Sequence, residues 1–417
     1  MSTSPVQELV VSGFGVTSAI GQGAAAFTSA LMEGAARFRV MERPGRQHPS
    51  NGQTTAHLGA EIPSLAVPEG VTPQMWRSAT FSGQATLVTV HEAWNAARLQ
   101  AVPGHRIGLV VGGTNVQQRD LVLMHDAYRE RVPFLRAAYG STFMDTDLVG
   151  LCTQQFAIHG MSFTVGGASA SGLLAVIQAA EAVLSRRVDV CIAVGALMDV
   201  SYWECQGLRA MGAMGTDRFA REPERACRPF DRESDGFIFG EACGAVVVES
   251  AEHARRRGVT PRGVLSGWAM QLDASRGPLS SIEGETQVIG AALRHADLAP
   301  ERVDYVNPHG SGSRQGDAIE LGALKACGLT HARVNTTKSI TGHGLSSAGA
   351  VGLIATLVQL EQGRLHPSLN LVDPIDSSFR WVGAIAEAQS LQNALVLAYG
   401  FGGINTAVAV RRSATES

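Results

Sequence analysis

The stretch that decides the fold is residues 163–174, which read FTVGGASASGLL. Residues typical of a strand come first, then a run of glycine, alanine and serine, and then an apolar stretch with helical spacing that continues to Leu184. Small residues around a central hydroxyl indicate a tight strand–turn–helix elbow that exposes Ser169 at a helix N-terminus. Taken alone, the segment is equally typical of close packing with a serine helix cap.

Short apolar strands and longer alanine- and leucine-rich helices alternate on both sides of this elbow, which is typical of an α/β protein with a covered sheet. The expected strands are Leu9–Val11, Gly108–Val111, Val188–Val194, Gly244–Glu249, Val264–Trp268, Val303–Asn307 and Leu395–Gly400. The expected helices are Phe81–Ala97, Leu173–Leu184, Glu285–His295, Asp317–Cys327 and Gly349–Glu361.

A seam divides the chain near Glu252–Pro261, where Arg255–Arg257 interrupt the apolar pattern. It predicts two α/β halves of similar kind, residues 1–252 and residues 253–417. The arginine run is typical of a solvated helix end. Residues 37–63 are polar and contain proline and glycine, so we expect an irregular excursion there.

Composition excludes several classes of protein. Of the 417 residues, 45% are hydrophobic and 17% charged, and the net charge of −3 argues against a dedicated nucleic-acid binder. The sequence has no uninterrupted apolar run long enough to span a membrane and no signal-peptide pattern, so we expect a cytoplasmic protein. The six cysteines lack CxxC or zinc-ligand spacing, which favours reduced core residues and no metal.

Two further glycine-flanked segments contain residues suited to chemistry. Residues 306–313, VNPHGSGS, place His309 in a loop after a strand, with Ser311 and Ser313 behind it. Residues 335–344, NTTKSITGHG, contain Lys338 and His343, and Lys338 is one of only two lysines in the chain. Each segment alone has a plainer interpretation, a surface histidine in the first and a buried ion pair in the second.

Together with residues 227–231 (CRPFD), 235–241 (DGFIFGE) and 400–405 (GFGGIN), these segments resemble the β-ketoacyl synthases of the thiolase superfamily. The elbow is similar to that family's TACSSG-type motif, His309 falls in its HGTxT…GDxxE motif, and Lys338 with His343 in its KSxxGHxxxAxG motif. The resemblance runs from about Val10 to Val410. It implies an α/β thiolase-like fold, in which two similar βαβαβαββ halves form a layered α-β-α-β-α core.

One departure from the family pattern decides the expected activity: the chain has Ser169 where the family has its nucleophilic cysteine. A serine hydroxyl is far less acidic than a thiol and needs an adjacent base, and the sequence supplies no obvious one. By resemblance, His309 and His343 bind the carbonyl of a malonyl thioester and stabilise the enolate left by loss of CO₂. The chain thus resembles the free-standing decarboxylases of polyketide β-branching cassettes, which convert malonyl-acyl carrier protein to acetyl-acyl carrier protein.

The resemblance also implies roles for the remaining site residues. Lys338 pairs with Glu320 and orients the histidine loops, while Ser169 lines the pocket and contacts the thioester. Ser311 and Ser313 replace threonines that hydrogen-bond the phosphopantetheine arm. The gate residue that shields the substrate carboxylate is Phe401. Ile404 departs from the family's small polar residue or histidine at that position. Glu320, Ser311, Ser313 and Phe401 are accordingly the expected substrate-binding set.

The expected partners follow from the same resemblance. They are an acyl carrier protein that brings the substrate on its phosphopantetheine arm, a second copy in a homodimer joined through the strand before the elbow, and an HMG-CoA-synthase-like pathway enzyme. No cofactor or metal beyond that arm is expected, and no nucleic acid or membrane. Arg255–Arg257 and Arg186–Arg187 are candidate docking sites for the carrier protein.

Two other functions are compatible with these motifs. Ser169 could accept an acyl group, which would make the protein a condensing or acyl-transfer enzyme. Alternatively, the chain could be a non-catalytic subunit similar to a chain-length factor, although the presence of His309, His343 and Lys338 argues against that function.

Overall fold

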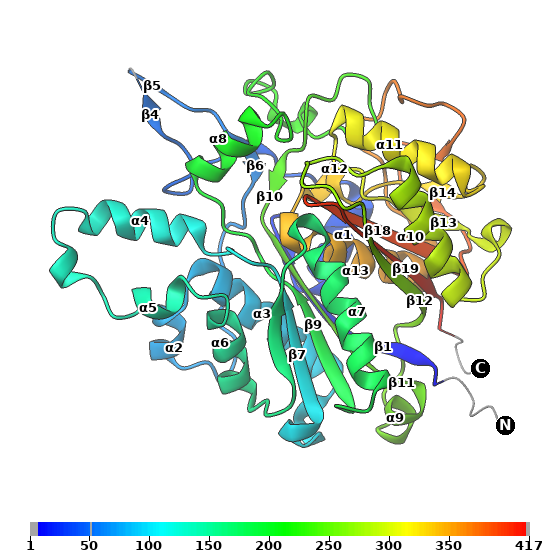
Figure 1. Ribbon diagram of the computed structural model, residues 1–417, viewed down its shortest axis with the longest axis horizontal. Helices are drawn as coiled ribbons and strands as arrows, with labels where there is room; N and C mark the ends of the chain where they lie inside the picture. The colour runs from blue at the N-terminus through cyan, green and yellow to red at the C-terminus, as the bar shows by residue number, and fades with distance from the viewer. Residues whose placement is uncertain (1–6, 51, 414–417) are drawn as a thin grey trace.

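Two similar sets of β-strands form the core of the protein, whose computed structural model describes residues 7–50 and 52–413 (Figure 1). The strand order is β8–β7–β9–β11–β1 in the first half and β14–β13–β18–β19–β12 in the second. The first-half strands are β1 (Leu9–Ser18), β7 (Ile107–Gly112), β8 (Ser162–Val165), β9 (Val190–Gly195) and β11 (Ala242–Ser250). Those of the second half are β12 (Gly263–Leu272), β13 (Tyr305–Asn307), β14 (Arg333–Val334), β18 (Asn393–Gly400) and β19 (Ile404–Arg411).

The same sequence of elements builds each half. The principal helices of the first half are α3 (Phe81–Ala96), α6 (Asp147–Phe156) and α7 (Ser171–Leu184). Those of the second half are α10 (Ile282–His295), α11 (Arg314–Ala326) and α13 (Ala348–Gln362). Each half therefore reads βαβαβαββ. The halves join where β1 pairs antiparallel with β12, from Leu9 opposite Leu265 to Val11 opposite Gly263. The thiolase-like α/β fold is thereby confirmed.

Helices α7 and α13 form the middle layer, between the strands of the two halves (Figure 1). Both are apolar almost all round, and most of their residues are buried. Helix α3 packs on β1 and β11, and α10 packs on β12 and β19, so these helices cover the two outer faces. A helix with apolar residues on every side is stable only inside such a core. The N-termini of α7 and α13 place the residues of the candidate site.

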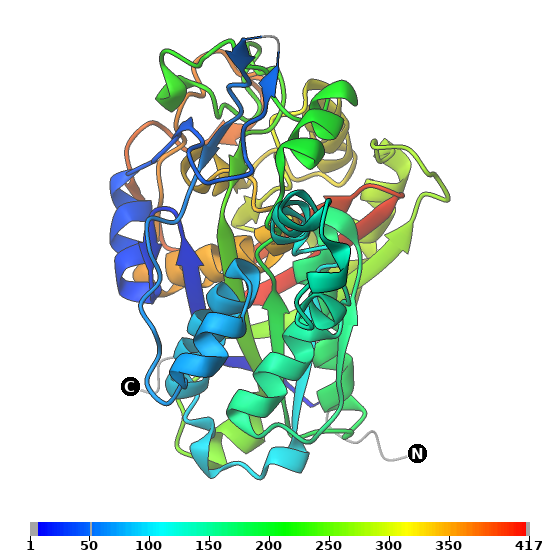
Figure 2. The ribbon, with the colours of Figure 1, turned by 90° about the vertical axis from the view of Figure 1, so that its left-hand side faces the viewer.

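Shorter elements complete the chain. They are β2 (Gly21–Gln22), α1 (Ala24–Glu33), α2 (Pro73–Ser78), α4 (Gln118–Tyr128), α5 (Tyr139–Thr142), α8 (Tyr202–Ala210), α9 (Ala251–Arg256), α12 (Lys338–Thr341), β15 (Arg364–Leu365), β16 (Arg380–Trp381) and β17 (Glu387–Ala388). Helices α4 and α5 extend from the side of the first half and face the viewer in Figure 2. No helix among the described residues is long and apolar enough to cross a membrane.

The expected strands and helices all occur, but the first strand is longer than expected. The glycines after Val11 suggested a turn, whereas β1 continues to Ser18 with a register shift between Val11 and Gly13. Gly13 and Gly15 are needed because α3 lies directly against the strand. A Cβ at Gly15 would overlap the carbonyl oxygen of Thr89, so these glycines serve close packing.

The expectation of an irregular excursion at residues 37–63 is wrong in part. Strands β3 (Arg39–Val40) and β6 (Leu58–Ala60) form a small sheet with β10 (Phe239–Gly240), and β4 (Pro49–Ser50) pairs with β5 (Gln53–Thr54). Arg46 is fully buried and its guanidinium forms ion pairs with Asp199 at 2.8 Å and Glu241 at 2.6 Å. Part of the polar composition therefore reflects charges that are paired inside the protein.

All six cysteines are free thiols, and five of them are buried. Burial raises the pKa of Cys191, Cys205 and Cys227 to about 12, so these thiols stay protonated at neutral pH. The expectation that most cysteines are small core residues is confirmed.

Candidate active site

The predicted elbow is present. Strand β8 leads into a single 3₁₀ turn, Ala168–Ala170, that opens helix α7. Ala168 has a φ of +46°, an unusual value for a residue other than glycine. The hydroxyl of Ser171 accepts from the N–H of Gly167 at 2.9 Å and donates to the carbonyl of Ala168 at 2.7 Å. These two bonds fix the turn and direct Ser169, 8% exposed, into a cavity.

The turn after β18 packs directly against this elbow. A Cβ at Gly400 would overlap the carbonyl oxygen of Gly167, so the two backbones approach as closely as they can. Phe401 follows and contributes to the wall of the same cavity. Gly402 and Gly403 have φ values of +87° and +76°, which return the chain into β19.

His343 lies beside Ser169, with its Nε2 at 3.3 Å from the Ser169 hydroxyl oxygen. The backbone N–H of Leu345 donates to the other ring nitrogen, Nδ1, at 3.1 Å. A nitrogen that accepts this bond carries no hydrogen, so the ring hydrogen is on Nε2 and points toward Ser169. Burial, and after it the positive charge of Lys338, lowers the pKa of His343 well below its ordinary value. The ring is a neutral hydrogen-bond donor.

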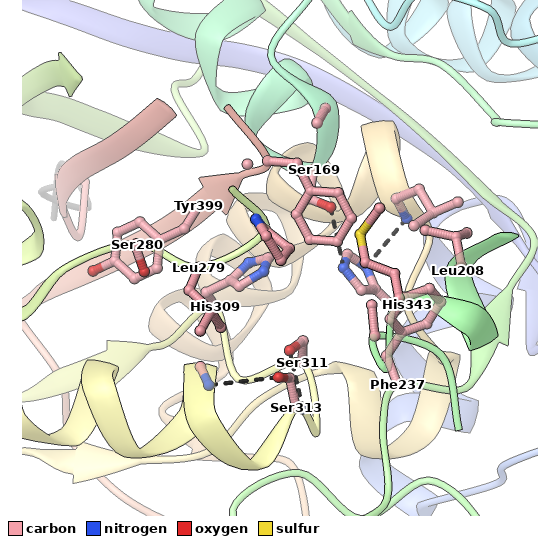
Figure 3. Close-up of a pocket in the computed structure, with 18 of the residues that line it drawn as sticks. Ser169, Leu208, Phe237, Leu279, Ser280, His309, Ser311, Ser313, His343 and Tyr399 are labelled. Carbon is pink, nitrogen blue, oxygen red and sulfur yellow. Dashed lines mark hydrogen bonds between the residues drawn. The ribbon is translucent and has the colours of Figure 1, made fainter. Parts of the chain in front are cut away.

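His309 reaches the same cavity from the loop after β13. Its ring centroid lies 5.4 Å from that of His343, with the planes at 78°. Burial lowers the pKa of His309 well below its ordinary value, and the charge of Lys338 adds to the shift. Both imidazoles are therefore neutral at physiological pH, and Figure 3 shows them in the same pocket as Ser169.

Two ionisable side chains hold the His309 loop. The carboxylate of Glu320, on α11, accepts from the N–H groups of His309 at 2.6 Å and Gly310 at 2.7 Å. The ammonium of Lys338, the first residue of α12, donates to the carbonyl oxygen of His309. In the described structure both side chains bind the loop backbone. The direct Lys338–Glu320 pair expected from the sequence is replaced by this arrangement.

Glu320 also differs from its expected role as a substrate-binding residue. It is 2% exposed, and the residues that line the cavity do not include it. Asp317, one helical turn earlier, has a similar position: its carboxylate accepts from the N–H groups of Phe230 at 2.7 Å and Gly312 at 3.1 Å. Both carboxyl groups therefore support the loop that contains His309 and Ser311. Their hydrogen bonds go to the backbone of this loop and, for Asp317, also to the backbone of Phe230.

Ser311 and Ser313 line the cavity, as the sequence predicted. The N–H of Ser313 donates to the Ser311 hydroxyl oxygen at 3.2 Å, and the Ser313 hydroxyl oxygen caps α11 by accepting from Gly316 at 3.5 Å. In both cases the oxygen is the acceptor, so each hydroxyl hydrogen remains available to a ligand.

The cavity has a volume of about 200 Å³ and mainly apolar walls. Its polar lining comprises Ser169, Ser280, Glu285, His309, Ser311, Ser313, Gln315, His343 and Tyr399. Its large apolar lining residues are Met198, Leu208, Met211, Phe237, Leu279, Leu345 and Phe401. No lysine or arginine lies among the described lining residues.

The sequence analysis did not single out Glu285 or Tyr399. A signal for Glu285 is present in the helical pattern, because the residue lies on the buried face of α10 that also contains Val288, Ile289 and Ala292. A carboxyl group on an apolar helix face indicates either a paired charge or a functional group.

The candidate docking arginines lie away from this cavity. Arg186 and Arg187 follow the C-terminal end of α7, whose N-terminal end carries Ser169, and 14 helical residues span roughly 20 Å. Helix α9 lies at the opposite end of the molecule from α12 in Figure 1. Arg257 is also engaged, because it pairs with Glu249 at 2.6 Å and donates to the carbonyl of Ala97. Neither run adjoins the pocket.

The chain belongs to the β-ketoacyl synthase family. The model of the family's N-terminal domain matches residues 7–254, and the model of its C-terminal domain matches residues 262–372. The family resemblance is thus confirmed, while the expected boundary between residues 252 and 253 stays a prediction.

The chain is also similar to individual proteins and solved structures. Over 411 residues the chain is 54% identical to the polyketide biosynthesis malonyl-ACP decarboxylase PksF of Bacillus subtilis (strain 168), with 99% of this chain and 98% of that protein covered. A crystal structure of a β-ketoacyl synthase from Burkholderia phymatum STM815 has a TM-score of 0.87 at 23% identity, and the match covers 98% of this chain and 100% of that one. A type II polyketide ketosynthase in complex with its acyl-carrier protein, AntDE:AntF, has a TM-score of 0.84 at 23% identity, and the match covers 98% and 100%.

Proposed function

We propose that the protein is a decarboxylase that converts malonyl-acyl carrier protein to acetyl-acyl carrier protein in polyketide biosynthesis. The observation that carries this proposal is the pair of neutral imidazoles, His309 and His343, that face one small cavity beside a serine without a base. The 54% identity to a protein named as such a decarboxylase supports it.

The two rings act on the thioester carbonyl. When the bond between the malonyl carboxylate and the methylene carbon breaks, its electron pair forms an enolate whose charge is on that oxygen. Nε2–H of His343 and the ring of His309 stabilise this charge, and removal of one such donor typically costs about 10²–10³ in rate. Because both rings are neutral and already face the cavity, little reorganisation is needed during the reaction.

The cavity also favours departure of the carboxylate. Its described lining lacks a lysine or arginine that would hold the negative charge, and Phe401 and Phe237 present apolar faces. A carboxylate in such surroundings is less stable than in water, whereas neutral CO₂ is not penalised. Phe401 is in this proposal the residue that shields the substrate carboxylate.

Ser169 is unsuited to nucleophilic attack. A serine hydroxyl needs a base within hydrogen-bond reach, and the nearby ring nitrogen, His343 Nε2, already carries a hydrogen. The serine oxygen accepts from that nitrogen, and its hydroxyl hydrogen remains available to donate to the substrate. This geometry supports decarboxylation over the condensing or acyl-transfer activity that the sequence left open.

The proposed supporting roles follow from the contacts. Glu320 binds the backbone N–H of His309 and Lys338 binds its carbonyl oxygen, so together they fix the loop. Ser311 and Ser313, which line the cavity, donate to the phosphopantetheine arm. The substrate is proposed to arrive on an acyl carrier protein, without any other cofactor or metal. A ketosynthase of the same fold, AntDE, forms such a complex with its acyl-carrier protein AntF, which supports this proposal.

The protein is proposed to form a homodimer, to supply a pathway enzyme and to act in the cytoplasm. Strand β8 lies at the end of the strand order and its residues are half-buried, so it is suited to pair with a second copy in a homodimer. An HMG-CoA-synthase-like enzyme is proposed to use the acetyl product in β-branching, and the cytoplasm is proposed as the location.

The test is direct. Purified protein is incubated with malonyl-loaded carrier protein, and the mass of the phosphopantetheine arm is followed by mass spectrometry. We expect loss of the mass of CO₂ and formation of acetyl-carrier protein, without a covalent adduct on Ser169. A malonyl arm that stays unchanged, or a lasting acyl adduct on the enzyme, would reject the proposal.

A further inference from the structure

A buried carboxyl group lines the same cavity on the far side of His309. Glu285 lies in the first turn of α10 and is 0% exposed. One carboxyl oxygen, Oε1, accepts from the hydroxyl of Ser280, while the other, Oε2, has no hydrogen-bond partner among the described residues. Figure 3 shows Tyr399 and Ser280 on the opposite side of His309 from His343.

Decarboxylation needs a proton that the groups discussed so far do not supply. The enolate becomes acetyl only when its terminal carbon gains one proton. The ring hydrogens of His309 and His343 are engaged with the enolate oxygen, and the ammonium of Lys338 is bound to the His309 carbonyl outside the cavity lining. A serine hydroxyl is too weak an acid to donate readily at neutral pH.

Glu285 is held in its acidic, protonated form by its surroundings. Burial raises its pKa well above the ordinary value, and the charges of Glu320 and Asp273 act in the same direction. Two neighbouring carboxyl groups cannot both ionise easily. Glu320 accepts two backbone N–H bonds, which favour its charged form, whereas Glu285 accepts one hydroxyl. Burial also raises the pKa of Glu320, to about 8, but its two backbone N–H bonds oppose that shift, so Glu285 holds its proton more firmly than Glu320 does, despite its place at a helix N-terminus.

We propose that the carboxyl group of Glu285 donates the proton that converts the enolate to the acetyl product, an inference that rests on the proposed decarboxylase function. The O–H bond of Glu285 breaks as a C–H bond forms at the terminal carbon, directly or across one water in the cavity. The resulting carboxylate regains a proton from solvent through water that enters the cavity. Overall, one proton is consumed for each CO₂ released.

The decisive variant is Glu285→Gln, which keeps the shape and the acceptor for Ser280 but removes the acidic proton. Its matched control is Glu283→Gln, because Glu283 lies in the same helical turn and is exposed. We expect acetyl formation to fall about 100-fold in Glu285→Gln, in the range typical of a general acid, and to be unchanged in Glu283→Gln.

A second readout separates proton donation from bond cleavage. An enolate that waits for its proton can recapture CO₂, so ¹³C-labelled bicarbonate should enter the malonyl arm in Glu285→Gln while acetyl formation is slow. Retention of this exchange together with slow acetyl formation supports the proposal. Loss of both, or acetyl formation at the wild-type rate, overturns it. A wild-type protein that forms no acetyl would instead reject the decarboxylase function itself.

The pH profile gives a third measure. Activity should fall as pH rises through the pKa of Glu285, since only the protonated form donates. The groups that face this carboxyl are Glu320 on α11, Asp273 after β12, Tyr399 on β18 and Ser280, and His309 in turn packs against Tyr399. The alkaline loss should be absent in Glu285→Gln, and its persistence there would assign it to another group and contradict the proposal.

Discussion

The backbone N–H of Leu345 donates to Nδ1 of His343 at 3.1 Å, and this one bond determines where the imidazole carries its hydrogen. Leu345 has a φ of +53°, a conformation that a leucine seldom adopts. The strained peptide directs its N–H at the ring, so that Nε2–H faces Ser169 and the cavity. Hydrogen-bond donation by His343 thus depends on the backbone of its own loop.

Removal of a ring donor should abolish most activity. We expect His343→Ala and His309→Ala each to lower the rate of acetyl formation about 10²–10³-fold with little change in fold, because each loses one donor to the enolate oxygen. His343→Gln, which keeps an N–H donor, should retain more activity than His343→Ala. Rates are measured by mass spectrometry of the carrier arm, and full activity in either alanine variant would refute the role of that ring.

The hydroxyl of Ser169 should be dispensable for decarboxylation. Having a hydroxyl instead of a thiol at this position should also prevent acylation of the enzyme. Ser169→Ala should retain activity within about tenfold, since the serine contributes at most one hydrogen bond. Ser169→Cys should gain the ability to take an acyl group from an acyl-carrier protein, because a thiol at a helix N-terminus forms a thiolate more readily. The check is intact-protein mass. An acyl adduct on the wild-type serine would contradict this prediction.

The two lysines of the chain provide a matched pair of variants. Lys338→Met removes the donor to the His309 carbonyl and should lower kcat about 10–100-fold with KM nearly unchanged, because a buried charge-assisted hydrogen bond is lost. Lys325→Met, whose side chain is half exposed and pairs with Asp376, should leave both constants unchanged. Steady-state kinetics distinguish the two, and equal effects of the two variants would show that Lys338 does not position His309.

The contact between the elbow and the turn after β18 can be tested with glycine variants. Gly400→Ala should lower the melting temperature and the activity strongly, because the added Cβ overlaps the carbonyl oxygen of Gly167. Gly402→Ala is the control: nothing lies within 4 Å of its Cβ, so only its positive φ is strained, at a cost of about 1–2 kcal/mol. Thermal unfolding measures both. A Gly400→Ala protein at least as stable as Gly402→Ala would contradict the close contact.

The sequence was sufficient for the layout of strands and helices, since their apolar periodicity matches their burial in the structure. It also identified Ser169, His309 and His343 as candidate site residues, because each lies in a motif flanked by glycine. It did not reveal the length of β1, where glycines that allow close helix packing look like turn residues. Buried Arg46 was hidden in the same way, because composition alone does not show that a charge is paired inside.

The sequence also could not specify which groups bond to one another in the site. Lys338 and Glu320 have opposite charge, which suggested a direct pair, yet each bonds to the backbone of the His309 loop. Backbone N–H and carbonyl groups are present at every residue and leave no mark in a sequence. Glu285 was missed for a different reason, because it lies outside every motif and becomes notable only when the cavity is known.

Both central helices begin in the same way. A 3₁₀ turn precedes each of them, and its first residue has positive φ: Ala168 at +46° before α7 and Leu345 at +53° before α13. The first copy of this turn displays a side chain, Ser169, while the second presents a peptide N–H to His343. The active site thus combines two copies of the same backbone turn, one from each half of the chain. One copy positions a side chain and the other positions a peptide N–H, so a single half would lack one of these two groups.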